Sequence, residues 1–139
     1  MGRWRSEDGS VTVFVVGLTL ALMMVAGLVF DGGRILAARR QAHDLADNAA
    51  RAAAQAVDLD ALRSGAPVEL DPLAAQVAAE DYLAATGHTG TVLVSADSVE
   101  VTVTITTPMV LLQIAGVSER TVTASGQARL VRGITGPES

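Results

Sequence analysis

Hydrophobic and polar positions divide the chain into regions with different periods, and the first region has no polar face at all. Val11 to Phe30 is a run of twenty residues without a charged side chain, and twelve of them are Val, Leu or Phe. As an α-helix this run is about 30 Å long, which matches the hydrocarbon core of a bilayer. A lone strand would leave its backbone groups unpaired in lipid. We therefore predict a transmembrane helix over residues 11–30. A cleaved signal peptide and a buried core element are the alternatives.

After the run, apolar residues recur every three or four positions, as on one face of an α-helix. The stripe consists of Ile35, Ala38, Ala42, Leu45, Ala49, Ala53 and Ala56. Because most of these side chains are alanine, the stripe is shallow and suits close approach by a sheet or a second helix. We predict an amphipathic helix over residues 31–57 that continues the span, with Gly32 and Gly33 as the candidate site of a bend.

The next segment predicts a loop followed by a second helix. Gly65, Pro67 and scattered acidic residues interrupt the helical pattern, which favours a loop over residues 58–72. Asp71 followed by Pro72 is typical of a helix start, and Gly87 is typical of a helix end. The second helix is therefore expected to run to about Thr86.

Beyond Gly90 the period changes to two, which indicates strands. The apolar positions are Val92 and Val94, then Val99, Val101, Val103 and Ile105, and they alternate with Ser95, Glu100, Thr102, Thr104 and Thr106. Ala96, Asp97 and Ser98 form the turn between the two strands. Residues 120–131 alternate in the same way and predict a third strand. The pattern as a whole predicts an α+β fold: a long N-terminal helix, a second helix and a three-stranded antiparallel sheet. Residues 58–131 would form a small domain with the spine helix, and the tail 132–139 is expected to be disordered.

Composition narrows the possible partners. The net charge is −5 and the chain has four aromatic residues, which argues against a nucleic-acid surface. The chain has no cysteine, so no disulfide framework is possible. All ten basic residues are arginine; Arg3 and Arg5 precede the span, whereas Arg34, Arg39 and Arg40 follow it. This near tie means that charge alone does not orient the protein in a membrane.

No residue pattern points to catalysis, to a cofactor or to a small-molecule substrate. His43 and Asp47 are spaced to pair on one helix face, and His88 lies in a turn sequence. The four acidic residues Asp58, Asp60, Glu69 and Asp71 lack the spacing of a calcium loop. Nucleophile, phosphate-loop and dinucleotide motifs are missing from the sequence. We therefore expect no metal site and no enzyme activity.

One segment is unusually apolar for a connection between strands. Pro108 to Val117 contains five neighbouring candidates for contact with a partner or with the membrane: Met109, Val110, Leu111, Leu112 and Ile114. Two interpretations remain open. The segment is a short helix that caps the end of the sheet, or it is an exposed patch that touches the bilayer or a partner protein.

The chain resembles the TadE/TadG-like proteins of the tight-adherence (Flp) pilus system, especially the short actinobacterial forms. The resemblance is carried by SEDGSVTVFVV before and within the span, by FDGGRILAARRQAHDLADNAARAAAQAVDLDAL after it, and by the closing TVTASGQARLV. Pilin-like relatives have a Gly followed five residues later by Glu, and are cleaved after that Gly. Here Phe14 stands five residues after Gly9, so we expect no processing of this kind.

The resemblance implies a structural, non-catalytic component of pilus assembly or of a related secretion apparatus. Its partners would be the lipid bilayer and proteins of that machinery, with no nucleic acid. The resemblance further implies a single-pass protein of the bacterial cell membrane, with residues 1–10 in the cytoplasm and the C-terminal domain outside. The alternatives are an anchored extracytoplasmic binding module unrelated to pili, or an accessory subunit of a membrane enzyme.

Overall fold

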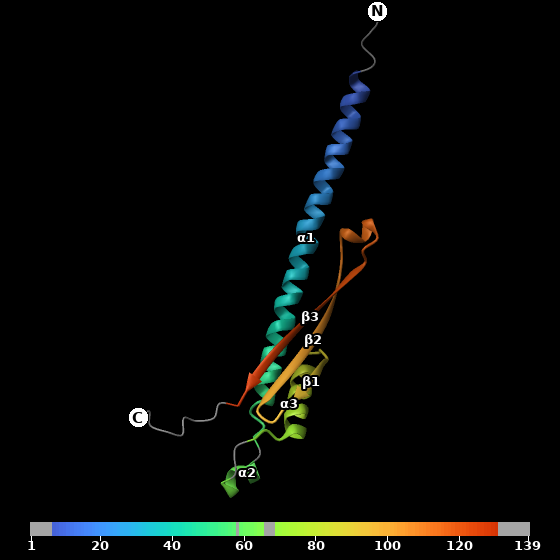
Figure 1. Cartoon of the computed structure of the whole chain (residues 1–139). Coiled ribbons are helices and arrows are strands. Elements are labelled where there is room, and N and C mark those ends of the chain that lie inside the picture. The colour runs from blue at the N-terminus through green and yellow to red at the C-terminus, as the bar shows by residue number, and fades with distance from the viewer. Residues whose placement is uncertain (1–6, 58, 66–68, 131–139) are drawn as a thin grey trace, which may run out of the picture. The chain divides into compact units, whose positions relative to one another are not determined.

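The computed structural model describes residues 7–57, 59–65 and 69–130 and confirms the α+β class. Its elements are α1 (Glu7–Ala53), α2 (Leu59–Ser64), α3 (Pro72–Ala85), β1 (Gly90–Val94), β2 (Ser98–Pro108), the 3₁₀ helix η1 (Leu112–Ala115) and β3 (Glu119–Arg129) (Figure 1). The chain forms two compact units. Unit 1 combines Met1–Leu36 with Thr107–Arg120, and unit 2 combines Ala37–Thr106 with Thr121–Ser139. The predicted disordered tail lies outside the described residues.

Helix α1 is 47 residues long and continues without a break through Gly32 and Gly33. From Val11 to Phe30 the helix has no charged residue, and large side chains such as Val13, Met24 and Val29 are exposed. The hydroxyl of Thr19 donates to the carbonyl of Val15 at 2.8 Å, so this polar group is satisfied within the helix. Among the described residues, α1 is the one helix that is long and apolar enough to cross a membrane.

The expected loop between the two main helices contains secondary structure that the sequence pattern missed. Helix α1 ends at Ala53, and Val57 instead forms an isolated antiparallel bridge with Leu70. The short helix α2 (Leu59–Ser64) then occupies part of the segment that we predicted to be a loop. With six residues it is too short to show a helical period, and Gly65 ends it with a φ of 75°.

Helix α3 has the ends that its sequence predicts. The Oδ1 atom of Asp71 accepts hydrogen bonds from the backbone N–H groups of Leu73 (3.0 Å) and Ala74 (3.1 Å), and Pro72 occupies the first turn. At the other end Gly87 adopts a φ of 74°, and the His88 N–H donates to the carbonyl of Leu83 at 2.9 Å. These bonds satisfy backbone groups that the helix leaves unpaired.

The three strands form one sheet in the order β1-β2-β3. Strands β1 and β2 pair antiparallel, with Val92 opposite Val101 and Val94 opposite Val99, which confirms the predicted hairpin. Between β2 and β3, side-chain hydroxyl groups form three cross-strand hydrogen bonds: Thr102 with Ser125, Thr104 with Thr123, and Thr106 with Thr121. Residue numbers rise along β2 as they fall along β3, so these two strands are also antiparallel. The alternation therefore places polar residues on one face of the sheet and valines on the other.

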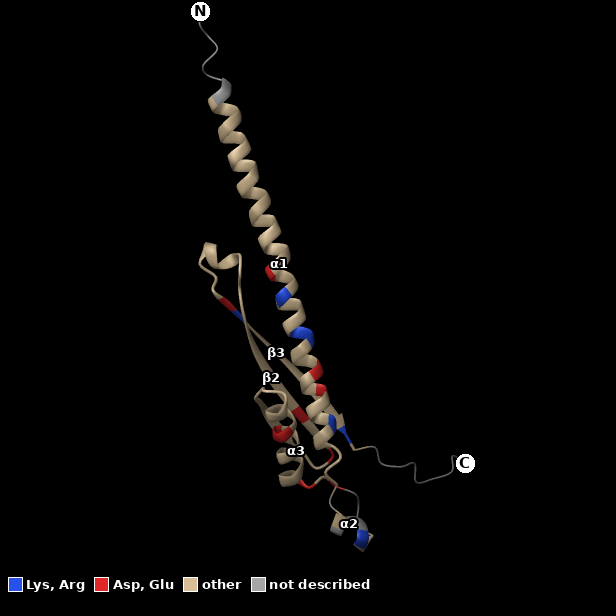
Figure 2. Ribbon diagram, turned by 180° about the vertical axis from the view of Figure 1, so that it is seen from behind, with Lys and Arg blue, Asp and Glu red and all other residues tan. Residues whose placement is uncertain are grey.

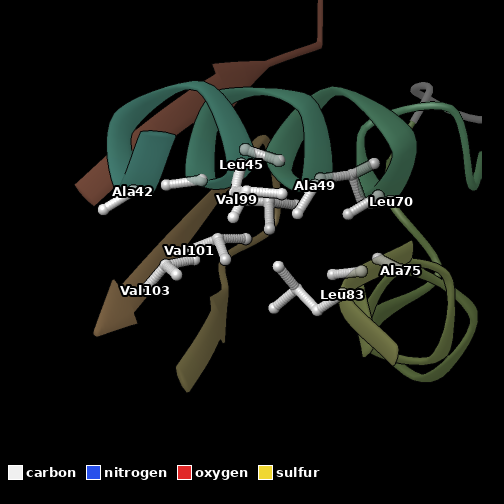
Figure 3. Close-up of a cluster of buried hydrophobic side chains, with 13 residues drawn as sticks. Ala42, Leu45, Ala49, Leu70, Ala75, Leu83, Val99, Val101 and Val103 are labelled. Atoms are coloured by element: carbon white, nitrogen blue, oxygen red, sulfur yellow. The ribbon is translucent and has the colours of Figure 1, made fainter. Parts of the chain in front are cut away.

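The core of unit 2 lies between the valine face of the sheet and two helices. Val99, Val101 and Val103 of β2 are fully buried, and Figure 3 shows them facing the alanine stripe of α1 and Leu83 of α3. Five alanines of α1 are fully buried: Ala42, Ala46, Ala49, Ala50 and Ala53. Because the core has few large side chains, its small apolar residues are buried only where the backbones of helix and sheet lie close together.

Gly126 of β3 marks the closest approach of sheet and helix. A Cβ atom at this position would lie 2.5 Å from the carbonyl carbon of Ala46 and even closer to the backbone N of Asp47. The Asp47 carboxylate, whose Oδ1 would lie 2.5 Å away, could move aside, but the two backbone atoms could move only with the helix itself. The glycine is therefore required by the packing of β3 on α1.

The substitution Gly126→Ala is expected to destabilise the protein by about 1–3 kcal/mol, because the added methyl group pushes the helix backbone away from β3. Without this clash, alanine would be favoured over glycine within a strand by about 0.5–1 kcal/mol. A loss of stability in the variant would therefore indicate the clash with α1. Chemical unfolding of the full chain in detergent, followed by circular dichroism, measures it. The exposed neighbour provides the control, since Gln127→Ala should stay within about 0.5 kcal/mol. A Gly126→Ala variant as stable as the parent would contradict the close packing.

Candidate functional site

The apolar connection between β2 and β3 is an ordered loop built around η1. The Met109 N–H donates to the carbonyl of Ser118 at 2.9 Å and closes the base of the loop. At the other end of η1, the N–H of Val117 donates to the carbonyl of Leu112 at 3.0 Å, and Gly116 adopts a φ of 88°. We call residues 109–117 the apolar loop.

A single carboxylate on α1 holds the first turn of this loop. Oδ1 of Asp31 accepts a hydrogen bond from the Val110 N–H at 3.0 Å, and Oδ2 accepts from Leu111 at 2.9 Å and from Leu112 at 2.7 Å. All three donors are backbone amides, and that of Leu112 belongs to the first residue of η1, where a helix leaves its N–H groups unpaired. The side chain of Asp31 is completely buried. A buried carboxylate is costly unless its oxygens are satisfied, and here both oxygens have donors.

The surroundings of Asp31 favour its ionised form. Burial raises the pKa of the Asp31 carboxyl, but the three amide donors and the nearby Arg34 guanidinium together outweigh burial and hold that pKa below its ordinary value. The carboxylate is therefore charged at neutral pH, which strengthens the three hydrogen bonds that it accepts.

Apolar contacts accompany these hydrogen bonds. A Cβ atom on Gly27 would lie 3.0 Å from the Cβ of Leu111, so the missing side chain of Gly27 leaves room for the loop. Beside this contact lies an open groove of about 700 Å³. Residues of α1 between Leu20 and Leu28 form one wall, and Leu111, Leu112, Ile114 and Ala115 form the other. Every lining residue is apolar.

The five predicted contact residues differ in burial. Met109 is 2% exposed, Leu112 is half-buried, Val110 and Leu111 are about 40% and 39% exposed, and Ile114 is 85% exposed. The apolar loop carries no charged residue, and neither does α1 from Gly9 to Phe30. Beyond them, the next charged residues are Asp31 on the helix and Glu119 on the strand (Figure 2). The apolar loop is therefore buried at Met109 and exposed at Ile114.

Asp31 was not among the residues that the sequence suggested for a site. The available signal was its position as the first carboxylate after twenty uncharged residues, within a continuous helix. Its partners lie 79 to 81 positions further along the chain, so no local pattern links them.

Of the other polar residues considered, His43, His88 and Asp71 have partners within unit 2. His43 Nε2 lies 3.8 Å from Oδ2 of Asp47 on the surface of α1, as the spacing predicted. His88 Nδ1 lies 2.8 Å from the Thr86 carbonyl, within the turn after α3. Of the four acidic residues, Asp71 caps α3 and Glu69 is exposed, whereas Asp58 lies outside the described residues.

Replacing Asp31 by asparagine is expected to release the apolar loop. The amide keeps only one acceptor oxygen, loses the charge and directs a donor group toward backbone donors. Amide hydrogen exchange at Val110, Leu111 and Leu112 in the full chain should become faster by about tenfold or more. The matched control is Asp44→Asn, which changes an exposed carboxylate of the same helix and should leave this exchange unaltered. Equal protection of the three amides in both variants would show that Asp31 does not hold the loop.

A family model of known proteins matches a segment that covers most of α1. Residues 9–56 match the family model Tad, described as "Putative Flp pilus-assembly TadE/G-like". No curated protein and no solved structure matches the chain. The matched segment covers the apolar half of α1, Asp31 and the alanine stripe. The resemblance stated from the sequence is thereby confirmed for residues 9–56, which are similar to this TadE/G-like family.

Proposed function

We propose that this protein is a membrane-anchored, non-catalytic component of Flp (Tad-type) pilus assembly or of a related secretion apparatus. The observation that carries the proposal is the family match over residues 9–56. A TadE/G-like segment implies involvement in Flp pilus assembly, and the exposed apolar half of α1 suggests anchoring in a membrane. The specific role, as a pilin-like subunit or as an accessory protein, is part of the proposal.

The apolar run supports an anchor because its large side chains, such as Phe14, Met24 and Val29, are exposed in the part of unit 1 that the structure describes. In water, contiguous exposed apolar surface of this kind would favour aggregation. In a bilayer the same surface is favourable, and the helical backbone satisfies its own polar groups. We propose residues 11–30 as the span, residues 31–57 as its helical continuation, and residues 58–131 as a small extracytoplasmic domain. Residues 1–10 would lie in the cytoplasm.

The polar side chains support a structural role. Asp31 binds backbone amides, Asp71 caps a helix, and His43 pairs with Asp47. Each of these groups is used to position the chain. Two alternatives stay in view: an anchored binding module unrelated to pili, and an accessory subunit of a membrane enzyme. Both predict a normal pilus in cells that lack the protein.

Deleting the gene in its native host is therefore expected to abolish or strongly reduce surface pili, as counted by electron microscopy. The full chain should restore them. A matched variant in which residues 7–30 are replaced by a cleavable secretion signal should not, because the released domain has lost its anchor. Normal piliation after deletion would overturn the pilus assignment.

Membrane topology is tested separately. Protease added to intact spheroplasts should remove an epitope placed after Ser139, while an epitope placed before Met1 should survive until the membrane is lysed. Charge does not decide this orientation, since arginines flank the span on both sides. The reverse pattern of protection would show that the domain faces the cytoplasm.

A further inference from the structure

We propose that the apolar loop itself enters the bilayer beside α1, and that lipid acyl chains fill the groove between them. The inference rests on the proposed span of α1 and adds a second membrane contact from a distant part of the sequence. It assigns a partner, the hydrocarbon of the leaflet next to Asp31, to Val110, Leu111, Leu112 and Ile114.

The groove lies beside the part of α1 that is proposed to span the membrane. The α1 residues that line the groove, between Leu20 and Leu28, lie three to eleven positions before Asp31. At the helical rise this corresponds to about 5–16 Å along the axis. If residues 11–30 fill the hydrocarbon core, these positions lie within it. The loop residues that form the opposite wall of the same groove must then lie at the same depth.

Charged residues begin only beyond the groove, both on α1 and after the apolar loop. On α1 the uncharged stretch ends at Asp31, which Arg34 follows. After the apolar loop, the uncharged stretch ends at Glu119 and Arg120, where β3 begins (Figure 2). Both segments of unit 1 thus change from apolar to charged where they leave the groove. Among residues 109–117 only Gln113 has a polar side chain, and it is uncharged and exposed. A charged side chain inside the bilayer would be far more costly than this amide.

The backbone of the apolar loop has hydrogen-bond partners within unit 1. In hydrocarbon there is no water, so a backbone polar group must find its partner within the protein. The amides of Val110, Leu111 and Leu112 donate to Asp31. Further along the loop, donors at Ile114, Gly116 and Val117 reach the carbonyls of Leu111, Gln113 and Leu112. Asp31 therefore supplies the acceptors that the loop needs in order to leave water.

Lipid is favoured over a protein partner because of what the groove adjoins. Large side chains are exposed around the whole circumference of the α1 run, including the consecutive Phe14, Val15 and Val16. The groove is open and continuous with this surface, which lipid already covers if α1 spans the membrane. Ile114, the most exposed residue of the loop, extends the same apolar surface.

Fluorescence quenching tests the proposal on the full chain, which contains no cysteine of its own. Single variants Ile114→Cys, Leu22→Cys and Ala84→Cys are labelled with a polarity-sensitive dye. The proteins are reconstituted in vesicles of phosphatidylcholine and phosphatidylglycerol. Quenchers are lipids brominated on their acyl chains and iodide in the water. Leu22 reports the span, and the exposed Ala84 of α3 reports the aqueous side.

The dye at position 114 is expected to behave like that at position 22, with blue-shifted emission, strong quenching by brominated lipid and little by iodide. The dye at position 84 should show the opposite. Quenching of position 114 by iodide, with position 22 still in lipid, would overturn the inference while leaving the anchor intact. Iodide quenching at position 22 would overturn the anchor itself. Protection of position 114 from both quenchers would mean a protein occupant and would also overturn the proposal.

The role of Asp31 is tested in the same vesicles. Adding Asp31→Asn to Ile114→Cys should abolish the quenching by brominated lipid at position 114, whereas Asp44→Asn should not. A label at Ala115 repeats the measurement in case the dye at position 114 disturbs the loop. If the Asp31→Asn loop stays in lipid at both positions, Asp31 does not hold it there.

Discussion

The three hydrogen bonds that Asp31 accepts from the backbone of residues 110–112 are the interaction on which unit 1 depends. They join two segments about eighty positions apart in the sequence, a membrane-type helix and the connection between two strands. A peptide group that leaves water needs a partner, and a carboxylate provides two oxygens that can serve several amides at once. The apolar side chains of the loop then pack against α1 where Gly27 leaves space.

Unit 2 is stabilised in a different way, because its core contains few large residues. The helix presents alanines, β2 presents valines and β3 presents Gly126 at the point of contact. Small residues bury little area each, so stability depends on bringing backbones close together. The polar faces that remain carry hydroxyl pairs between strands, and these suit a surface in contact with water.

Helix α1 is thus one continuous helix whose two halves have different surfaces. The first half exposes bulky apolar side chains and the second half buries alanines. This division is the physical basis for the proposed role, since an anchor needs the former and a folded domain the latter. The segment that is similar to the TadE/G-like family, residues 9–56, includes both surfaces.

Features with local causes were predictable from the sequence. The apolar run, the Asp71-Pro72 start and Gly87 end of α3, and the period-two alternation of the strands each depend on neighbouring residues, and the structure has them all. The helix α2, the end of α1 at Ala53 and the Val57–Leu70 bridge were not predictable, since they depend on short segments whose partners lie elsewhere. The same holds for Asp31. Its sequence position shows a carboxylate at the end of a membrane-type helix, but only the tertiary structure brings the amides of the distant loop to it, because that contact is set by the pairing of β2 with β3 and by no local period.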